Sequence, residues 1–454
     1  MPDFIIVILA VIFVLGIAIN IHEFGHFLVA KLFGMRVEAY SFFGLGPRIW
    51  GFKIGHTDYR ISAIPLGAYV KLYGDEATAP LEGGGSTDEK VPESELYELR
   101  PRWQKFLVML GGPFMNIVLA LAIPFAGALI YGVPSMPAPI VGFVQAGGAA
   151  DAAGIKAGDR IVVFDGRENP TWGNVRDDSI ISPEKELGVT VERGGQRIPL
   201  TVKPVRETIG GNPMGEIGMV PDAGVEPVEV DRIVEGGAAS ESELRPGDRV
   251  LAFNGKTVRN GQELMTQIPE NRDAPGVFVI ERNGERKEIT LQARPDEKGV
   301  YKVGVYFKPS VISTLEPVSV AGAASFAAES NLRILRMTGK VFGRVFTGET
   351  SPRDAGLAGP VGIVSQIALV VREAGFAGLV SILMVISLNL GVFNLLPIPL
   401  LDGGQILVLG IEKLLSWFGR TLSMAWKERI QLTGLAFILL LIVFVTFLDI
   451  SRFF

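Results

Sequence analysis

The sequence predicts a multi-pass α-helical membrane protein with four transmembrane helices, a small membrane-associated β segment and two small, mostly β domains. Three observations predict this class. The 454-residue chain is 48% hydrophobic and only 20% charged, and its mean hydropathy is +0.35. Four long apolar stretches account for this excess, and an internal repeat fills the polar segment between the second and third of them. Such a chain is too apolar to be an ordinary soluble or disordered protein.

The first predicted span covers residues 1–31. It contains no charged residue from Phe4 to Ile21, and it is long enough to cross a bilayer. A cleaved signal peptide is the alternative, but a signal peptide begins with basic residues and ends at a cleavage site of small residues. The only early charge is Asp3, and no such site precedes a polar start. We therefore expect this stretch to remain as a transmembrane helix.

Three further uncharged stretches predict spans within residues 103–133, 373–403 and 431–454. Four crossings place both termini on the same side of the membrane. The loop between the last two spans, residues 404–430, is rich in basic residues, namely Lys413, Arg420, Lys427 and Arg429. The positive-inside rule therefore predicts that this loop is cytoplasmic. The loop 32–102 is then cytoplasmic too, and the long segment between the second and third spans lies outside.

An internal repeat fills that outside segment. GGAAD at 147 recurs as GGAAS at 236, GDRIVVFDG at 158 as GDRVLAFNG at 247, and ERGGQR at 192 as ERNGER at 281. Each pair of positions differs by 89, so the segment contains two copies of one domain, predicted at 134–222 and 223–309. Runs rich in Val and Ile alternate with Gly-containing turns, which is typical of hairpins in a small β domain. Structural spacers and peptide-binding modules both fit this pattern.

Two further segments are predicted at the membrane surface. Residues 40–72 contain strand-like runs punctuated by Gly and Pro between two spans, and they predict membrane-associated β-hairpins. Residues 310–372 contain basic residues at helical spacing among apolar ones, at Arg333, Arg336, Lys340 and Arg344. This pattern predicts an amphipathic helix in the membrane interface and a connector. A helix that packs on the protein's own surface is the alternative.

Composition excludes several classes of function. The 43 basic and 48 acidic residues leave a net charge of −5. Because the chain lacks the basic surplus that holds a phosphate backbone, no nucleic-acid partner is expected. The absence of cysteine excludes disulfides, thiolate catalysis, iron–sulfur clusters and sulfur-ligated zinc. Any metal must therefore be held by carboxylates and by the three histidines, His22, His26 and His56.

His22, Glu23 and His26 form the sequence HEFGH inside the first apolar stretch. Residues i and i+4 share one face of a helix, so both imidazoles can bind one zinc ion while Glu23 takes a proton from the attacking water. The alternative, in which these residues serve only as core packing, would be costly inside a membrane helix. The motif therefore predicts a hydrolytic zinc site.

A catalytic zinc usually has three protein ligands and one open position. His56 lies in the polar run GFKIGHTDY and is predicted to be a solvated surface residue. Glu38 follows the first span closely and stays a possible third ligand. Asp402 is the stronger one, because it ends the apolar run LLPIPLLDGGQ, where a carboxylate near hydrocarbon needs a partner. The ends of the first and third spans also share a side of the membrane, so Asp402 can meet HEFGH at one depth.

Pro397 and Pro399 are expected to unwind the chain just before Asp402. Irregular backbone at membrane depth is tolerated only where it is buried in protein or lines a wet cavity. Such a cavity suits hydrolysis, since water is the second substrate.

Several motifs together resemble the site-2 protease family of intramembrane zinc metalloproteases. They are HEFGH in a first membrane helix, GGPFMN at 111–116, GLAGPVGIV at 356–364, NLLPIPLLDGG at 394–404 and the tandem repeat. The chain resembles most closely the bacterial regulator-of-sigma-E protease branch, in which the two repeats are PDZ domains. The resemblance runs over essentially the whole chain, and it implies a zinc metalloendopeptidase with Zn²⁺ as its cofactor.

The resemblance implies a role for each matching residue. His22, His26 and Asp402 would bind the zinc ion. Glu23 would be the general base, and Asn394 would contact the substrate backbone.

The strand-like segment would correspond to the family's β-loop, which pairs with an unwound substrate. Its predicted substrate-binding residues are Gly67, Ala68, Tyr69 and Val70. A helical substrate hides its peptide bonds in its own hydrogen bonds, so cleavage requires unwinding, and an added strand satisfies the freed backbone groups.

The resemblance also implies partners and a location. The substrates would be single-span membrane proteins, typically an anti-sigma factor already trimmed outside by another protease, and sometimes remnant signal peptides. The PDZ pair would filter substrates by size or bind peptide ligands. The protein would lie in the lipid bilayer of a bacterial inner membrane, with its termini and PDZ domains in the periplasm and its active site toward the cytoplasm.

Two other classes of function stay open on the sequence alone. A catalytically silent PDZ scaffold or chaperone would keep the metal only for structure, and intact Glu23 speaks against it. A metal transporter also places His and Asp in membrane helices, but the spans contain too few ionisable residues to form a relay across the bilayer.

Overall fold

The computed structural model describes residues 3–64, 67–74, 91–135, 138–209, 212–222, 228–258, 261–271, 274–295, 301–308, 315–353, 355, 357–420 and 422–451. The chain divides into two compact units. The helical unit consists of Met1–Val133 and Pro317–Phe454, and the β unit consists of Pro134–Glu316.

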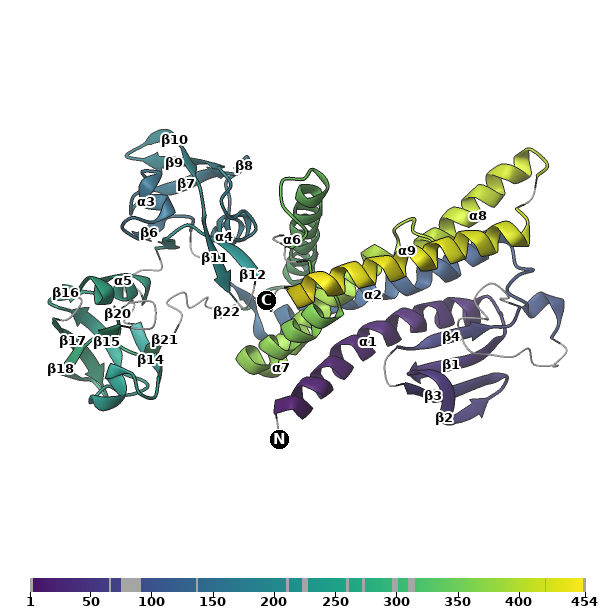
Figure 1. Cartoon of the computed structure of the whole chain (residues 1–454), viewed down its shortest axis with the longest axis horizontal. Helices are drawn as coiled ribbons and strands as arrows, with labels where there is room; N and C mark the ends of the chain where they lie inside the picture. Colours follow the sequence, from purple (N-terminus) through teal and green to yellow (C-terminus); the bar gives the residue numbers. More distant parts are fainter. Residues whose placement is uncertain are drawn as a thin grey trace. The chain divides into compact units, whose positions relative to one another are not determined.

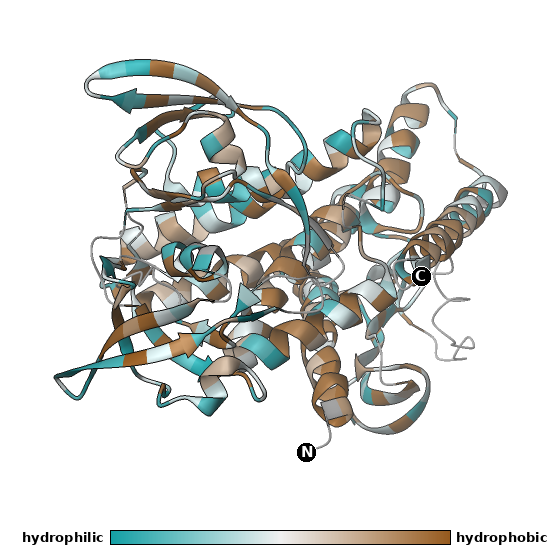
Figure 2. Cartoon of the chain, turned by 60° about the vertical axis from the view of Figure 1, so that its left-hand side comes forward, coloured by the Kyte–Doolittle hydropathy of each residue, from teal (hydrophilic) through white to brown (hydrophobic). Residues whose placement is uncertain are grey.

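Among the described residues, four helices contain segments long and apolar enough to cross a membrane. They are α1 (Asp3–Leu32), α2 (Arg102–Tyr131), α7 (Pro360–Asn394) and α9 (Met424–Ser451). α1, α2 and α7 lie side by side (Figure 1) around a core that includes Val14, Ala18 and Ile367. Hydrophobic positions cover most of α1 (Figure 2), as expected of a helix that faces protein on one side and lipid on the other.

Glycines bring α1 and α2 into backbone contact beside the HEFGH sequence. A Cβ atom on Gly25 would lie 2.1 Å from the carbonyl oxygen of Gly111, which is closer than any real contact of this kind. Only glycine therefore fits at this crossing. The close approach places α2 directly against the histidines of α1.

α7 differs from the predicted third span at both ends. The sequence predicts a span at 373–403, whereas α7 begins at Pro360, has a non-helical kink at Gly375 and ends at Asn394. It ends there because the prolines that follow disfavour a continued helix. After a turn, Asp402 begins a further helix, α8 (Asp402–Trp417). The loop predicted at 404–430 is therefore helical over much of its length.

The turn between α7 and α8 folds tightly onto the first turn of α8. A Cβ atom on Gly403 would lie 2.2 Å from the carbonyl oxygen of Leu395, and one on Gly404 would lie 2.1 Å from that of Ile398. Leu400 has a φ of 84°, a left-handed conformation that is strained for leucine. The two glycines of LDGG thus allow the close packing that holds Asp402 in position.

Asp449, near the C-terminal end of α9, caps the N-terminus of α7. Its carboxylate accepts hydrogen bonds from the backbone N–H groups of Gly359 (3.1 Å) and Gly362 (2.8 Å), which have no partner inside the helix. The negative charge also suits the positive end of the helix dipole. A Cβ atom on either glycine would lie 2.8 Å from an Asp449 oxygen, which gives these two glycines of GLAGPVG a structural reason.

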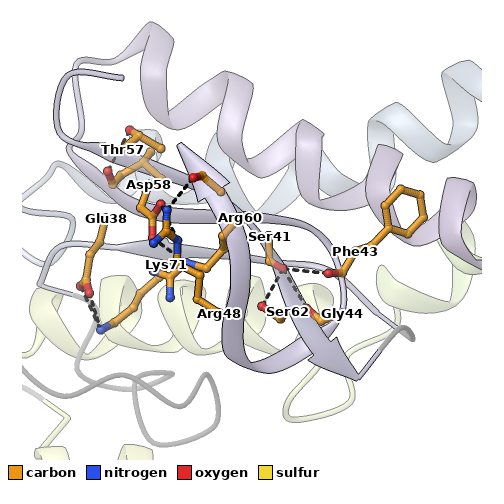
Figure 3. A network of polar contacts seen from close by, with 12 residues as sticks. Glu38, Ser41, Phe43, Gly44, Arg48, Thr57, Asp58, Arg60, Ser62 and Lys71 are labelled. Atoms are coloured by element: carbon orange, nitrogen blue, oxygen red, sulfur yellow. Dashed lines mark hydrogen bonds and ion pairs between the residues drawn. The ribbon is translucent and has the colours of Figure 1, made fainter. Parts of the chain in front are cut away.

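The segment after α1 forms a mixed sheet rather than hairpins alone. Its strands are β1 (Val37–Phe43), β2 (Leu45–Ile54), β3 (Thr57–Ile64) and β4 (Tyr69–Leu72), in the order β2-β3-β1-β4. β2 and β3 form a hairpin, β1 and β3 are parallel, and β4 pairs antiparallel with β1. Polar contacts such as those of Lys71 with Glu38 and Ser41 with Ser62 connect the strands (Figure 3).

α6 (Val320–Phe346) packs against α2 through small and polar residues. Ala323 and Ala327 are buried on this face, and Asn331 donates a hydrogen bond of 3.0 Å to the carbonyl oxygen of Ala120 in α2. The first half of α6 therefore packs on the protein itself, and the interfacial helix predicted from the basic residues further along α6 stays a prediction.

The β unit contains two copies of one strand arrangement. The first copy contains β6 (Val141–Val144), α3 (Ala149–Ala152), β7 (Arg160–Phe164), β8 (Arg167–Glu168), α4 (Trp172–Ile180), β9 (Leu187–Arg193), β10 (Gln196–Val202), β11 (Val205–Ile209), β12 (Asn212–Glu216) and β13 (Met219–Pro221). The second contains β14 (Val228–Ile233), β15 (Arg249–Phe253), β16 (Lys256–Thr257), α5 (Gly261–Asn271), β17 (Pro275–Arg282), β18 (Glu285–Gln292), β19 (Arg294–Pro295), β20 (Tyr301–Lys302) and β21 (Val305–Phe307). The order β10-β9-β7-β8 of the first copy is matched by β18-β17-β15 with β16 beside β15 in the second. The remaining short elements are η1 (Glu93–Glu95), β5 (Val133–Pro134), η2 (Ala238–Glu241) and β22 (Leu315–Glu316).

Each copy has a core of its own. The first core includes Ile161, Phe164 and Val189, and the second includes Val250, Phe253 and Phe278. The repeat in the sequence is therefore also a repeat in packing.

Candidate metal centre

The first turn of α8 lies against the C-terminal half of α1 and brings three potential metal ligands together. His22 and His26 lie one helical turn apart on one face of α1, and their Nε2 atoms are 3.2 Å apart. Asp402 Oδ2 lies 3.0 Å from His22 Nε2, and Asp402 Oδ1 lies 3.4 Å from His26 Nε2. One ligand atom from each residue lies within 4.8 Å of the others.

The donor set fits zinc. Two imidazole nitrogens and a carboxylate oxygen are ligands that zinc prefers, and three protein ligands leave one position open for chemistry. His22 and His26 are buried. Apart from its contact of 3.0 Å with His22 Nε2, Asp402 Oδ2 is buried without a hydrogen-bond partner among the described residues, which is costly for a carboxylate unless a cation balances it.

The other two sequence candidates lie elsewhere. The carboxylate of Glu38 forms an ion pair of 2.9 Å with the ammonium group of Lys71, within the polar network of the sheet (Figure 3). His56 is exposed in the turn between β2 and β3, as the sequence predicts. The structure therefore groups Asp402, and not Glu38, with the two histidines.

A cavity of about 440 Å³ opens beside the three residues. Glu23 lines it together with the histidines, Asp402 and Asn394. The backbone of Val70 lies close to the Glu23 carboxylate, and both residues line the cavity. The side-chain nitrogen of Asn394 lies 3.2 Å from His22 Nε2.

Only part of the predicted substrate-binding run reaches this cavity. Val70 of β4 lines it, and so does Leu72, which the sequence did not single out. Gly67 precedes β4, and its carbonyl oxygen accepts a hydrogen bond from the N–H of Gly44. Ala68 is buried outside the cavity lining, and the Tyr69 ring packs under the Arg60 guanidinium group at 5.8 Å.

The position of β4 follows from the packing of its sheet. Tyr40 of β1 pairs with Val70 in register, and its ring stacks on Phe27 of α1 with centroids 5.1 Å apart. Burial, together with the charge of Glu23, raises the pKa of Tyr40 to about 12, so its hydroxyl stays protonated at neutral pH. β4 forms an edge of the sheet within the described residues, and this edge meets the cavity.

Several lining residues were not predicted from the sequence. They are Val108, Met109, Leu400, Leu401, Gln405 and Gln431. Gln405 carries a weak signal, because it follows Asp402 by three positions and so shares its helical face. Leu400 and Leu401 directly precede Asp402, whereas Val108 and Met109 of α2 and Gln431 of α9 carry no signal of their own, since only tertiary packing brings these helices to the site.

The helical unit thus places two buried histidines and a carboxylate that could hold a metal ion beside a glutamate and a cavity. A sequence model of peptidase family M50 matches residues 10–441, which is most of the chain. The chain therefore belongs to peptidase family M50.

Individual relatives make the comparison more specific. The chain is 32% identical to "Protease RseP" of Yersinia pestis, over 89% of this chain and 90% of that protein. It is 30% identical to "Regulator of sigma-E protease RseP" of Escherichia coli K12, over 88% of this chain and 89% of that protein. It is 29% identical to a putative zinc metalloprotease of Vibrio cholerae, over 91% and 92% of the two chains. The family resemblance that the motifs indicate is thus confirmed.

Among solved structures, the PDZ domain of the SdrC-like protein from Listeria monocytogenes is similar to part of the chain. The match has a TM-score of 0.18 and 16% identity, and it covers 19% of this chain and 90% of that domain. The assignment of both repeats as PDZ domains stays a prediction.

Proposed function

We propose that this chain is a zinc metalloendopeptidase that hydrolyses a peptide bond within or next to the transmembrane segment of single-span membrane proteins. The observation that carries the proposal is the convergence of His22, His26 and Asp402 beside Glu23 on one cavity of the helical unit. Ionisable groups buried among membrane-compatible helices are expensive and mark functional sites. The zinc metalloprotease name of the Vibrio cholerae relative supports the same metal.

Each residue of the site has a role in this proposal. Zinc, when bound by His22, His26 and Asp402, would polarise the scissile carbonyl group and make water a better nucleophile at neutral pH. Glu23 accepts the proton of the attacking water and later donates it to the leaving amine nitrogen. The backbone N–H of Val70, close to the Glu23 carboxylate, would help to orient it for both transfers.

The edge of β4 is the proposed binding surface for an unwound substrate. Val70 and Leu72 of this strand line the cavity, so an extended segment that adds to β4 would run past Glu23 and the metal ligands. Strand addition satisfies the backbone groups that unwinding frees. Asn394 would donate a hydrogen bond from its amide to a substrate carbonyl oxygen, which helps to hold the peptide in register.

The proposed substrates are anti-sigma factors already trimmed outside the membrane, together with remnant signal peptides. The name of the Escherichia coli relative, a regulator of sigma-E protease, supports the first of these.

The proposed location is a bacterial inner membrane, with the β unit and termini in the periplasm and the active site toward the cytoplasm. The basic residues between α7 and α9 support this orientation. The two repeats, as PDZ domains, would pass trimmed substrates and exclude intact ectodomains.

Cleavage and zinc content measured on the same variants test the proposal. The purified full chain in lipid nanodiscs is incubated with single-span substrates that have minimal outside tails, and zinc is measured by elemental analysis. We expect wild type to cleave and to hold about one zinc per chain. Glu23→Gln should keep zinc and lose at least ~100-fold in cleavage rate, because it cannot transfer the proton. His22→Ala and Asp402→Ala should lose both zinc and cleavage.

Glu329→Gln is the matched control, because it neutralises an exposed glutamate of α6 that does not line the cavity. It should keep both zinc and cleavage. Full zinc retention in Asp402→Ala would remove Asp402 from the ligand set and return Glu38 as the third ligand. Zinc in wild type without cleavage of any of several substrates would favour a catalytically silent scaffold.

A further inference from the structure

One face of α2 lies directly behind the two imidazoles, and its sequence GGPFMN has no part in the mechanism above. We propose that Asn116 of this sequence is a positioning residue for His22. Its amide oxygen accepts the Nδ1 proton of the imidazole and so fixes the ring with Nε2 toward the metal. This inference rests on the zinc site of the proposed function.

The geometry of both rings determines which nitrogen must carry a proton. The Nε2 atoms of His22 and His26 converge on Asp402 at 3.0 and 3.4 Å, so Nε2 is the ligand atom in each ring. A neutral imidazole that binds a metal through Nε2 carries its proton on Nδ1 and needs an acceptor there. His26 has one, because its Nδ1 lies 2.7 Å from the carbonyl oxygen of Val108 in α2.

Asn116 is the corresponding partner of His22. The structure places its amide nitrogen 3.3 Å from His22 Nδ1. The amide nitrogen and oxygen of asparagine are interchanged by a half-turn and are assigned from their hydrogen bonds. Because Nδ1 donates when Nε2 is the ligand, the oxygen of Asn116 belongs on the His22 side.

Ser387 of α7 fits this orientation of Asn116. The Ser387 hydroxyl donates a hydrogen bond of 2.9 Å to the backbone carbonyl oxygen of Asn116. It lies 3.4 Å from Asn116 Oδ1, the amide end that faces away from His22 and that the half-turn replaces with nitrogen. The serine oxygen can therefore accept from the amide nitrogen. Asn116 and Ser387 are both fully buried, at 0% exposure, so bulk water is not available to replace either partner.

Asn394 is the competing partner for the same ring. Its amide nitrogen lies 3.5 Å from His22 Nδ1 and 3.2 Å from His22 Nε2. It is only partly buried and lines the cavity, where the substrate is expected. Asn116 instead lies behind the ring, on the side away from that surface, so its contact is compatible with both metal and substrate.

Zinc affinity, measured by competition with a chromogenic chelator on the full chain in detergent, tests the inference. Asn116→Leu removes the acceptor at similar volume and should weaken zinc binding by roughly 10- to 100-fold. Asn116→Asp keeps an acceptor oxygen and should bind zinc at least as tightly as wild type. Asn331→Leu is the matched control, since it removes another buried asparagine whose amide contacts α2, and it should leave zinc affinity unchanged.

The outcomes separate this inference from the zinc site itself. If wild type binds no more zinc than His22→Ala, the proposed metal site fails. If wild type binds zinc and Asn116→Leu binds it equally well, the positioning role fails. Equal losses in Asn116→Leu and Asn331→Leu, or a tenfold loss in Asn116→Asp, would show that only packing is disturbed and would also overturn the inference. A loss in Asn394→Ala alone would assign the role to Asn394.

Discussion

Gly112 leaves the space that the two imidazoles occupy. A Cβ atom at this position would lie 2.4 Å from His26 Nε2 and 2.8 Å from His22 Cε1. The rings cannot move aside freely, because His26 Nδ1 is tied to Val108 and His22 Nδ1 lies against Asn116. A side chain at 112 would therefore displace the ligand atoms themselves. The glycine is thus required by the metal centre rather than by the backbone conformation.

Gly112→Ala should lower zinc affinity at least about tenfold, as is usual when the support of a metal ligand is disturbed. Gly127→Ala is the matched control on the same helix, because a Cβ atom there would meet no atom within 4 Å. It should keep zinc affinity and could raise helix stability by about 0.5–1 kcal/mol. Chelator competition on both variants is the measurement. Equal zinc affinity in the two would contradict the steric argument.

The two copies in the β unit share, at equivalent positions, an ion pair between a buried aspartate and a partly exposed arginine. Arg193 donates to both carboxylate oxygens of Asp159 at 2.6 and 2.7 Å, and Arg282 does the same to Asp248 at 2.6 and 2.7 Å. The first pair joins the start of β7 to the end of β9, and the second joins the start of β15 to the end of β17. Because both aspartates are almost fully buried, at 1% exposure, the paired arginine is what makes their burial tolerable.

The pKa values of Asp159 and Asp248 predict a loss of stability in acid. Burial alone would raise each pKa. The hydrogen bonds and charge of the paired arginine, with a backbone N–H, outweigh burial and hold the pKa below its usual value. A depressed pKa contributes stability above the unfolded value, about 3.9, and that contribution is lost as the pH falls through the folded value.

Hydrogen exchange of β7 and β15 in the full chain, corrected for intrinsic rates, measures this loss between neutral pH and about pH 3. Asp159→Asn should weaken protection of β7 already at neutral pH and flatten its dependence on acid, because no carboxylate is left to titrate. The second copy is the internal control and should keep the wild-type dependence at β15. An unchanged acid dependence at β7 in the variant would assign the effect to other groups.

Across the whole helical unit, the metal centre joins segments that are far apart in the chain. His22 and His26 belong to α1, Asp402 begins α8, and Asn116 of α2 supports the site. A ligand that binds only the folded state stabilises it by mass action, by about 2.7 kcal/mol at a free concentration of 100 times Kd. In addition to its role in hydrolysis, zinc is therefore expected to stabilise the folded state of the helical unit.

Removal of zinc by a chelator should increase hydrogen exchange at the first turn of α8 and lower the unfolding temperature of the full chain. Without any chelator, Asp402→Ala should show the same hydrogen exchange at α8 as chelated wild type. Adding chelator to this variant should not change its exchange. The β unit, which contains none of the metal ligands, should exchange at the same rate in every sample. Chelation without effect on α8 in wild type would argue that Asp402 is not a ligand.

Local patterns were sufficient for the number of spans, the repeat and the histidine pair, but not for the bounds of the third span. Four charge-free stretches predict four membrane-compatible helices because lipid forces backbone polar groups to pair within a helix. The helical period places His22 and His26 on one face, and the constant offset of 89 between blocks predicts two copies of one domain. Each of these inferences depends on residues close together in the sequence.

Tertiary packing determined the third ligand and the residues that surround the site. The sequence favours Asp402 over Glu38 as third ligand, but only the folded chain shows Glu38 engaged with Lys71 and Asp402 against both histidines. The partners of the site, such as Val70 and Asn116, come from a sheet edge and a second helix. Contacts between residues this far apart depend on how side chains of several elements fill one space, and no local periodicity encodes that arrangement.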